Sequence, residues 1–336
     1  MKAPTNRRAI AIVAAVLIVG AGATILALRS GSERIATRSQ FVAGTPEADG
    51  QPAPLDTTLY LPRRTPAPAI LLAHGFGGSK ADLDGPARAL ARSGYAVLAY
   101  TARGFGRSGG LIHLDAPDYE VADASALVSY LATLPEVTRD APGDPRVGVA
   151  GSSYGGGLAL LLAGYDQRVD AVAADITWNS LAQALFPNSA QPAAGASPAP
   201  GVFKRLWAAQ LFASRSSGGA PDAGSGGGAG PAADGQCGRF APVLCSAYQA
   251  AAQTGAPDPE ILALLQASSP ASVLDRITAP TLLTQGQQDS LFPLSEADAN
   301  ARGIAAHGTA VKLVWRSGGH DGGISDGELT GDWTRW

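Results

Sequence analysis

The stretch RVGVAGSSYG, residues 146–155, decides the fold of this chain. Its apolar first half predicts a short buried strand, and the apolar run at 158–163 predicts a buried helix that begins directly after the serine. A sharp turn from strand to helix leaves no room for a side chain at Gly151 or Gly155 and lifts the Ser153 hydroxyl clear of the sheet. The start of the helix also directs free N–H groups at the reaction centre. The stretch therefore predicts Ser153 as a catalytic nucleophile.

The pattern G-x-S-x-G is weak by itself, because the chain holds 42 glycines in 336 residues. It recurs around Ser108, in residues 106–110, and around Ser325, in residues 323–327. Two glycines follow Ser108, so no helix is expected to begin there, and no strand is expected before Ser325. Only Ser153 combines the pattern with a strand before it and a helix after it.

A nucleophilic serine needs a base, and the base needs an acid that orients it. The predicted strand at 280–285 is followed by a loop that carries Asp289, and the predicted strand at 310–315 is followed by a loop that carries His320. The chain order serine, aspartate, histidine is the order that follows a strand-to-helix nucleophile turn of this kind. We therefore expect Asp289 to be the acid and His320 the base.

Alternatives to these two residues are few. The chain has 4 histidines, and His307 is expected between a helix and a strand, while His113 is expected in a polar loop. For the acid, Asp326 and Asp175 remain alternatives because they also lie near predicted loop ends. Asp321 is adjacent to His320 and cannot easily reach back to its ring.

The stretch HGFGG, residues 74–78, follows the predicted strand at 69–73. Glycines allow the backbone to come close to a substrate carbonyl. We expect the backbone N–H groups of Phe76 and Tyr154 to form an oxyanion hole, with His74 as a hydrogen-bonded structural residue.

These elements in this order resemble the α/β-hydrolase superfamily. The stretches YTARGFGRSGG, residues 100–110, and GSSYG, residues 151–155, are similar to the Xaa-Pro dipeptidyl-peptidase (S15) and cocaine-esterase-like group, over about residues 55–336. The resemblance implies a tyrosine hydroxyl in the oxyanion hole near the position where Phe76 stands. It also implies a C-terminal β-sandwich domain. Because the chain ends at Trp336, we expect either a fragment or a shortened last helix.

The predicted fold class is α/β, with a mostly parallel central sheet, helices on both faces and an inserted cap. An antiparallel pair opens the core, which spans residues 31–177 and 273–336. The alternation of strands and helices stops between 178 and 272, where we expect the cap.

Two cap helices are predicted, at 203–212 and 261–266, and a segment near 214–235, rich in Gly, Ser, Ala and Pro, is expected to be disordered. Aromatic residues of the cap either line a substrate pocket or hold the cap together; they are Trp178, Phe186, Phe203 and Trp207.

Lys2, Arg7 and Arg8 precede an uncharged and mostly apolar stretch at residues 9–28. This stretch is long enough to span a bilayer as a helix, and a signal peptide with a cleavage site at 21–23 is the alternative. Residues 1–30 are therefore left out of the fold. Both interpretations predict an exported protein that is either anchored in the membrane or secreted.

Export would place the 2 cysteines of the chain, Cys237 and Cys245, in an oxidising compartment. In an oxidising compartment they are expected to form a disulfide, and two buried free thiols are the alternative. No histidine is near them in the sequence, which argues against a metal site.

Charged residues make up 16% of the chain, and the formal net charge is −3, so no basic field for nucleic acid is present. The sequence shows no phosphate-binding loop or metal-ligand cluster, and no cofactor is implied. Two functions follow. One is an exported serine hydrolase for small ester or Xaa-Pro peptide substrates, and the other is a catalytically silent binding module at the cell surface.

Overall fold

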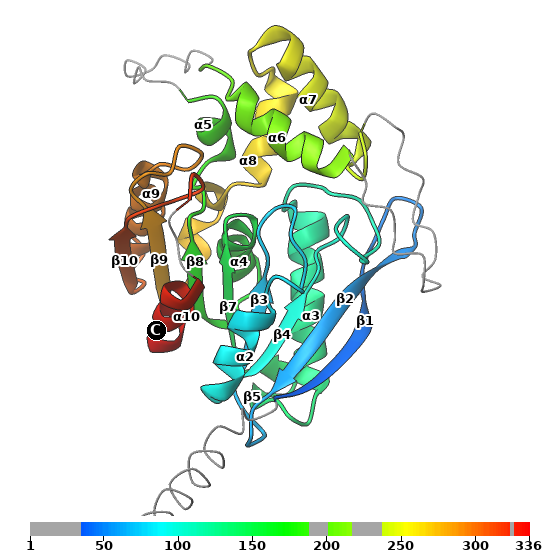
Figure 1. Ribbon diagram of the computed structural model, residues 1–336, viewed down its shortest axis with the longest axis vertical. Helices are drawn as coiled ribbons and strands as arrows, with labels where there is room; N and C mark the ends of the chain where they lie inside the picture. Colours follow the sequence, from blue (N-terminus) through cyan, green and yellow to red (C-terminus); the bar gives the residue numbers. More distant parts are fainter. Residues whose placement is uncertain (1–34, 188–200, 217–236, 323–325) are drawn as a thin grey trace, which may run out of the picture. The chain divides into compact units, whose positions relative to one another are not determined.

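Eight strands form one sheet in the computed structural model, which describes residues 35–187, 201–216, 237–322 and 326–336 (Figure 1). The spatial order of the strands is β1-β2-β4-β3-β7-β8-β9-β10. β1 pairs with β2, and β2 with β4, in antiparallel fashion, and every other neighbouring pair is parallel. The strands are β1 (Ala36–Pro46), β2 (Pro52–Leu61), β3 (Ala69–Ala73), β4 (Ala96–Tyr100), β7 (Val147–Ser152), β8 (Val169–Asp175), β9 (Thr281–Gly286) and β10 (Val311–Arg316).

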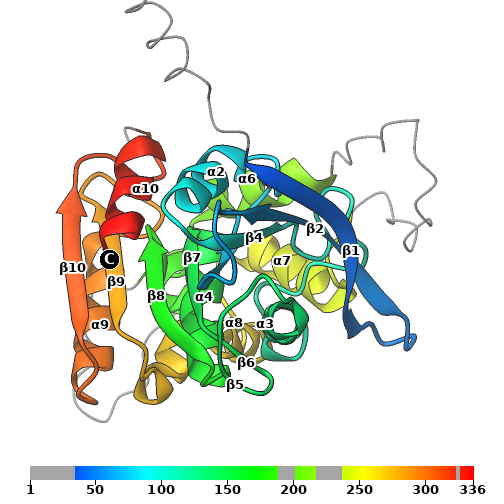
Figure 2. The ribbon, with the colours of Figure 1, turned by 90° about the horizontal axis from the view of Figure 1, so that it is seen from below.

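The central strands are almost wholly apolar because helices cover both of their faces. Every residue of β4 is buried, and β3 exposes only part of Ile70. Figure 2 shows α2 and α10 on one side of the sheet and α3 and α4 on the other. The helices around the sheet are α2 (Asp84–Arg92), α3 (Ala122–Thr133), α4 (Tyr154–Tyr165), α9 (Leu294–Ala305) and α10 (Asp326–Arg335). This arrangement confirms the predicted fold class.

Among the described residues, four α-helices lie between β8 and β9 in the chain, where the cap was expected, and three of them gather at one end of the sheet (Figure 1). The four are α5 (Leu181–Leu185), α6 (Arg205–Ser216), α7 (Pro242–Thr254) and α8 (Pro259–Ala267). α6, α7 and α8 are the cap helices. The expected disordered segment overlaps the last turn of α6 at residues 214–216, and its remainder lies outside the described residues.

The sequence did not predict α7, although both of its ends carry recognisable signals. Pro242 stands in its first turn, where a missing N–H costs nothing, and Gly255 ends it with φ +73°. A disulfide joins Cys237 to Cys245 of α7, as predicted, and ties the start of this helix to the segment before it.

A short hairpin of β5 (Arg139–Ala141) and β6 (Asp144–Pro145) precedes β7 and was also not predicted. The apolar stretch at residues 9–28 lies outside the described residues. Among the helices that the structure describes, none has the length and apolar character needed to cross a bilayer.

A buried ion pair fixes the loop after β4. The guanidinium of Arg103 is fully buried and binds both carboxylate oxygens of Asp123 in α3, at 2.6 and 2.7 Å. It also donates to Glu47 at 3.1 Å and to the Thr45 carbonyl at 2.8 Å. Arg103 therefore ties the loop after β4 to α3 and to the turn between β1 and β2.

We expect Arg103→Met to lower the free energy of unfolding by about 3–5 kcal/mol, because the buried carboxylate of Asp123 loses its partner. Urea unfolding followed by circular dichroism measures the change. Arg302→Met is the matched control, since Arg302 pairs with Asp298 on an exposed face of α9 and contributes little there. An Arg103→Met protein as stable as the parent would contradict this role.

Candidate active site

Ser153 lies at the turn between β7 and α4 in a strained backbone conformation, with φ +55° and ψ −116°. Such a conformation costs of order 1–3 kcal/mol in a residue with a side chain. Two hydrogen bonds hold it in place: the Ser153 N–H donates to the Asp175 carbonyl at 2.8 Å, and the Thr177 hydroxyl donates to the Ser153 carbonyl at 2.9 Å. The side chain of Ser153 makes no capping bond to α4, so its hydroxyl is available for chemistry.

The two glycines of the turn are required by close backbone contacts. A Cβ on Gly151 would collide with the carbonyl of Gly155, and a Cβ on Gly155 would collide with the carbonyl of Ala73 in β3. The helix start therefore presses against two neighbouring strands, which is the packing that the sequence pattern predicts.

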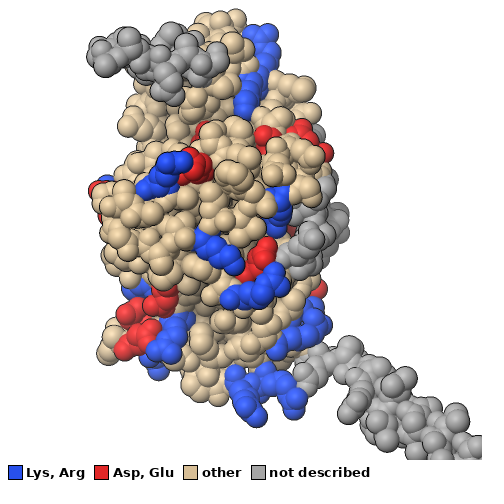
Figure 3. Space-filling view, turned by 90° about the vertical axis from the view of Figure 1, so that its left-hand side faces the viewer, with Lys and Arg blue, Asp and Glu red and all other residues tan. Residues whose placement is uncertain are grey.

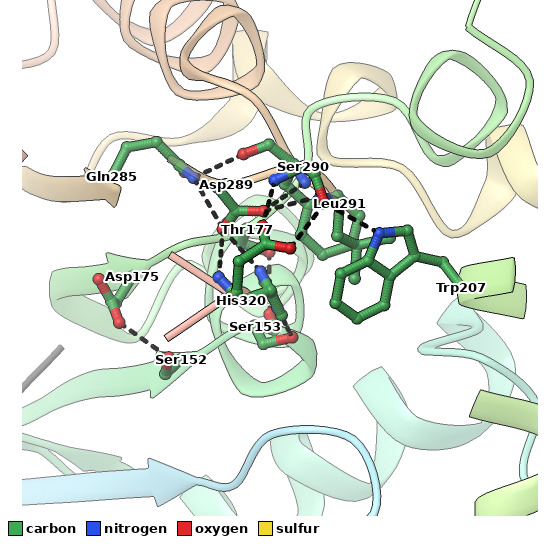
Figure 4. Close-up of polar contacts among 12 residues, drawn as sticks. Ser152, Ser153, Asp175, Thr177, Trp207, Gln285, Asp289, Ser290, Leu291 and His320 are labelled. Carbon is green, nitrogen blue, oxygen red and sulfur yellow. Dashed lines mark hydrogen bonds and ion pairs between the residues drawn. The ribbon is translucent and has the colours of Figure 1, made fainter. Parts of the chain in front are cut away.

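The structure brings Ser153, His320 and Asp289 together, as Figure 4 shows. His320 Nε2 lies 2.7 Å from the Ser153 hydroxyl oxygen, and His320 Nδ1 lies 2.6 Å from a carboxylate oxygen of Asp289. A carboxylate can only accept a hydrogen bond, so Nδ1 carries the proton and Nε2 is the acceptor that faces the serine hydroxyl. This is the tautomer that a general base needs.

Asp289 has a fully buried side chain whose second carboxylate oxygen is also occupied. This oxygen accepts the backbone N–H groups of Leu291 at 3.0 Å and Phe292 at 2.7 Å. The oxygen that faces the imidazole also accepts the N–H of His320 at 3.1 Å. These bonds fix the direction in which Asp289 holds the histidine ring.

The loops that carry the acid and the base meet at two glycines. A Cβ on Gly319 would collide with the backbone of Asp289, and a Cβ on Gly286 would collide with the Gly318 carbonyl. Close approach of these two loops places the carboxylate within reach of the ring.

The other candidate acids have different surroundings. Asp175 accepts from Ser152 at 2.8 Å and Thr284 at 2.6 Å, and it pairs with the guanidinium of Arg316. Burial raises the pKa of Asp175 above its ordinary value. Asp321 accepts from the N–H and hydroxyl of Ser290. The side chain of Asp326 lies outside the described residues.

Ser108 and His113 have structural surroundings of their own. Ser108 donates to the Thr101 carbonyl at 2.6 Å and accepts the Asp56 N–H at 2.9 Å, so it closes a loop. His113 lies 2.9 Å from Glu47, and burial lowers its pKa. His307 is exposed after α9, and Ser325 lies outside the described residues.

His74 is structural, as expected. Its Nε2 accepts the N–H of Ala102 at 3.0 Å, so its Nδ1 carries the proton and donates to the Gly75 carbonyl at 2.7 Å. The ring thereby fixes the loop at residues 74–78 to the loop after β4.

The two residues expected to form an oxyanion hole, Phe76 and Tyr154, lie in this region. A Cβ on Gly75 would be 3.8 Å from the Cβ of Ser153, so the loop after β3 runs beside the nucleophile. Among the described residues, no acceptor receives a hydrogen bond from the backbone N–H of Phe76 or Tyr154. The rings of these two residues meet edge to face, with centroids 5.4 Å apart.

The hydroxyl of Tyr154 is tethered to a buried acidic pair that the sequence analysis missed. It accepts the N–H of Asp115 at 3.0 Å and lies 3.3 Å from Glu120, to which it donates. Burial raises the pKa of Glu120 to about 7, and a bond from the His113 N–H opposes this. Burial likewise raises the pKa of Asp115 well above its ordinary value. These contacts hold the first residue of α4 in position.

Two of the four aromatic residues predicted for the pocket or the cap line an apolar cavity of about 100 Å³. They are Phe186 and Phe203, which also stack with centroids 4.9 Å apart. Trp178 does not line this cavity. It is buried against Gly157 of α4 and donates to the Ser268 carbonyl at 2.9 Å.

Trp207 of α6 does not line the cavity either and lies beside the triad. Its Nε1 donates to the Ser290 hydroxyl at 3.1 Å, and its ring centroid is 6.1 Å from that of His320 (Figure 4).

A second contact between the cap and the triad loop was not predicted. The ammonium of Lys204, just before α6, donates to the carbonyls of Ser290 and Leu291, both at 2.8 Å. These carbonyls directly follow Asp289 in the chain. Burial lowers the pKa of Lys204. A lone lysine gives no sequence signal for such a contact, because its acceptors are backbone atoms 86 and 87 residues away.

Among the described residues, no group of three or more His, Cys, Asp or Glu side chains is arranged to hold a metal ion. The strained serine, the histidine and the buried aspartate define a protein of the α/β-hydrolase class.

The comparison with known families gives a narrower placement. Residues 49–322 match the X-Pro dipeptidyl-peptidase (S15) family, so the chain belongs to that family. The resemblance stated from the sequence is thereby confirmed.

Individual relatives differ in what is known of them. The uncharacterized protein PA2218 of Pseudomonas aeruginosa is 37% identical over 123 residues, which covers 35% of this chain and 32% of that protein. The acylaminoacyl peptidase of Pyrococcus horikoshii superposes with a TM-score of 0.53 at 13% identity, over 87% of this chain and 39% of that chain. Acetyl xylan esterase 1 of Thermoanaerobacterium superposes with a TM-score of 0.55 at 19% identity, over 89% and 88%. These two structural likenesses show the fold alone.

Proposed function

We propose that this protein is a serine hydrolase that cleaves small carbonyl esters through an acyl-enzyme. The observation that supports it best is the continuous chain of hydrogen bonds from the Ser153 hydroxyl through His320 to Asp289, at 2.7 and 2.6 Å. Membership of the S15 family agrees with this chemistry.

The reaction follows from the geometry. His320 Nε2 takes the proton of Ser153 as its oxygen attacks the substrate carbonyl carbon. The N–H groups of Phe76 and Tyr154 stabilise the negative charge on the carbonyl oxygen, and Asp289 stabilises the imidazolium. His320 then gives the proton to the leaving alkoxide. Water, activated by the same imidazole, releases the acid and restores Ser153.

A catalytically silent binding module is the rival function. Such a module has no need to keep Ser153 strained with its hydroxyl directed at a correctly oriented imidazole. The cost of that strain favours catalysis.

Removal of the triad residues should abolish turnover. We expect Ser153→Ala or His320→Ala to lower kcat by about 10⁶, and Asp289→Asn by about 10⁴, because the wrong imidazole tautomer is then favoured. Fluorophosphonate labelling and ester hydrolysis measure this. Ser325→Ala and Asp326→Asn are matched controls and should keep both properties. Labelling of the Ser153→Ala protein would refute the assignment.

An ester is favoured over an amide by the residue at position 76. The resemblance implies a tyrosine hydroxyl near this position, and Phe76 has none. Its ring packs edge-on against Phe105 at 5.1 Å and against Tyr154. An amide has a poorer leaving group than an ester and depends more on a complete oxyanion hole, in which one donor is worth about 10²–10³ in kcat.

We therefore expect kcat/KM for p-nitrophenyl butyrate to exceed that for Ala-Pro-p-nitroanilide. Both substrates release a chromophore, so one spectrophotometric assay compares them, and Ser153→Ala supplies the background rate for each. A clear preference for the anilide would instead support an Xaa-Pro dipeptidyl-peptidase, the activity for which the family is named.

We also propose that the protein is exported, by the apolar segment at residues 9–28. The disulfide between Cys237 and Cys245 supports this proposal, because such bonds persist in oxidising compartments.

In the native host, fractionation should place the full chain in the membrane or outside the cytoplasm. Peptide mapping without reductant should recover the linked cysteine pair. A chain without residues 9–28 should remain in the cytoplasm with both thiols free to alkylate. Recovery of the full chain from the cytoplasm would argue against export.

A further inference from the structure

The apolar cavity lies between the cap helices and the loop after β3. No charged side chain lines it, and its wall combines leucine, isoleucine and alanine side chains with six aromatic ones: Phe76, Phe186, Phe203, Phe212, Phe240 and Tyr248. Phe76 belongs both to this wall and to the loop beside Ser153. The cavity therefore borders the oxyanion loop directly.

Phe240 contacts both cap helix α6 and the loop after β3. Its ring stacks on Phe212 of α6 with centroids 4.0 Å apart and lies over Phe76 with centroids 5.9 Å apart. Only 6% of Phe240 is exposed. A change in the size of this ring changes the volume next to Phe76.

Phe240 is held firmly although it lies in a loop. Its N–H donates to the Cys237 carbonyl at 3.1 Å, within the segment closed by the disulfide to Cys245. On either side of it, the Ile112 N–H donates to the Arg239 carbonyl at 2.7 Å, and the Ala241 N–H donates to the Ile112 carbonyl at 2.9 Å.

The Arg239 side chain adds a third attachment, to the glycine-rich loop after β4. Its guanidinium donates to the carbonyls of Gly106 at 3.2 Å and Gly110 at 3.3 Å, and to that of Ser108. The cap segment that carries Phe240 is thus hydrogen-bonded to the core at several points. The disulfide between Cys237 and Cys245 joins the two ends of this segment.

We propose that Phe240 is a specificity-determining residue that limits the acyl group of the substrate to a short, uncharged chain, with the Cys237–Cys245 disulfide as its positioning device. This inference rests on the proposed ester hydrolase. An apolar cavity of about 150 Å³ holds a benzene-sized molecule. This cavity, at about 100 Å³, suits a smaller group such as a butyryl chain. A charged acyl group would lose its hydration there without gaining a partner.

The test is an acyl-length profile of kcat/KM for p-nitrophenyl acetate, butyrate and octanoate with the full chain. The parent protein should prefer butyrate. Phe240→Ala enlarges the cavity and should shift the optimum to octanoate, with about a tenfold or greater loss on butyrate, since one methylene in a pocket is worth about 10–200-fold. Phe240→Trp fills the cavity and should shift the optimum to acetate.

Phe41→Ala is the matched control, because Phe41 is an exposed aromatic residue of β1 and should leave the profile unchanged. Opposite shifts in the Ala and Trp variants cannot come from general instability, which lowers all rates together. A profile that is the same in the parent, Phe240→Ala and Phe240→Trp overturns the inference and leaves the ester hydrolase standing. A parent protein with no esterase activity and no fluorophosphonate labelling overturns both.

A separate experiment tests the positioning role of the disulfide. A protein with Cys237→Ser and Cys245→Ser should show a broadened profile, with more octanoate hydrolysis relative to butyrate, while Ser153 labelling is kept. If that protein folds and retains the parent profile, the disulfide does not position Phe240. If it does not fold, the parent protein is assayed with and without a reductant that opens the disulfide, and an unchanged octanoate-to-butyrate ratio then counts against the positioning role.

Discussion

The close approach of α4 to β3 and β7 is the constraint on which the rest of the site depends. Gly155 lies so close to the Ala73 carbonyl, and Gly151 so close to Gly155, that neither position has room for a Cβ. At the same turn, Ser153 has a positive φ, and its side chain makes no capping bond to α4. The close approach also brings the loop after β3 beside the nucleophile. One packing contact therefore sets both the nucleophile and the expected oxyanion donors.

The acid and base depend on a second close approach, between the loops after β9 and β10. Gly286 and Gly319 permit it, since side chains there would meet the opposite backbone. Buried Asp289 accepts the N–H groups of Leu291 and Phe292 from its own loop and also binds the ring of His320. The triad geometry is thus fixed largely by backbone contacts, which explains why so few residue types at so few positions suffice to recognise it.

Residues of the cap contact both halves of the site. Lys204 binds the carbonyls that follow Asp289, Trp207 lies beside the ring of His320, and Phe240 lies over Phe76. The buried pair of Asp115 and Glu120 holds the hydroxyl of Tyr154 through hydrogen bonds. None of these contacts is visible in the sequence, because each joins residues that are far apart in the chain and of types that occur throughout it.

The sequence by itself determined the sheet, the helices that pack on it and the positions of Ser153, Asp289 and His320. Local apolar patterns specify strands, and obligatory glycines mark the sharp turns. It did not determine α7 or the β5–β6 hairpin, because alanine-rich helices and short hairpins carry little periodic signal. It also did not determine the place of Trp178, which depends on contacts with Gly157 and Ser268. Only the tertiary structure decided which of the aromatic residues line the cavity. Such a surface forms only when the cap packs on the core, and its composition depends on distances between chain segments that no local pattern encodes.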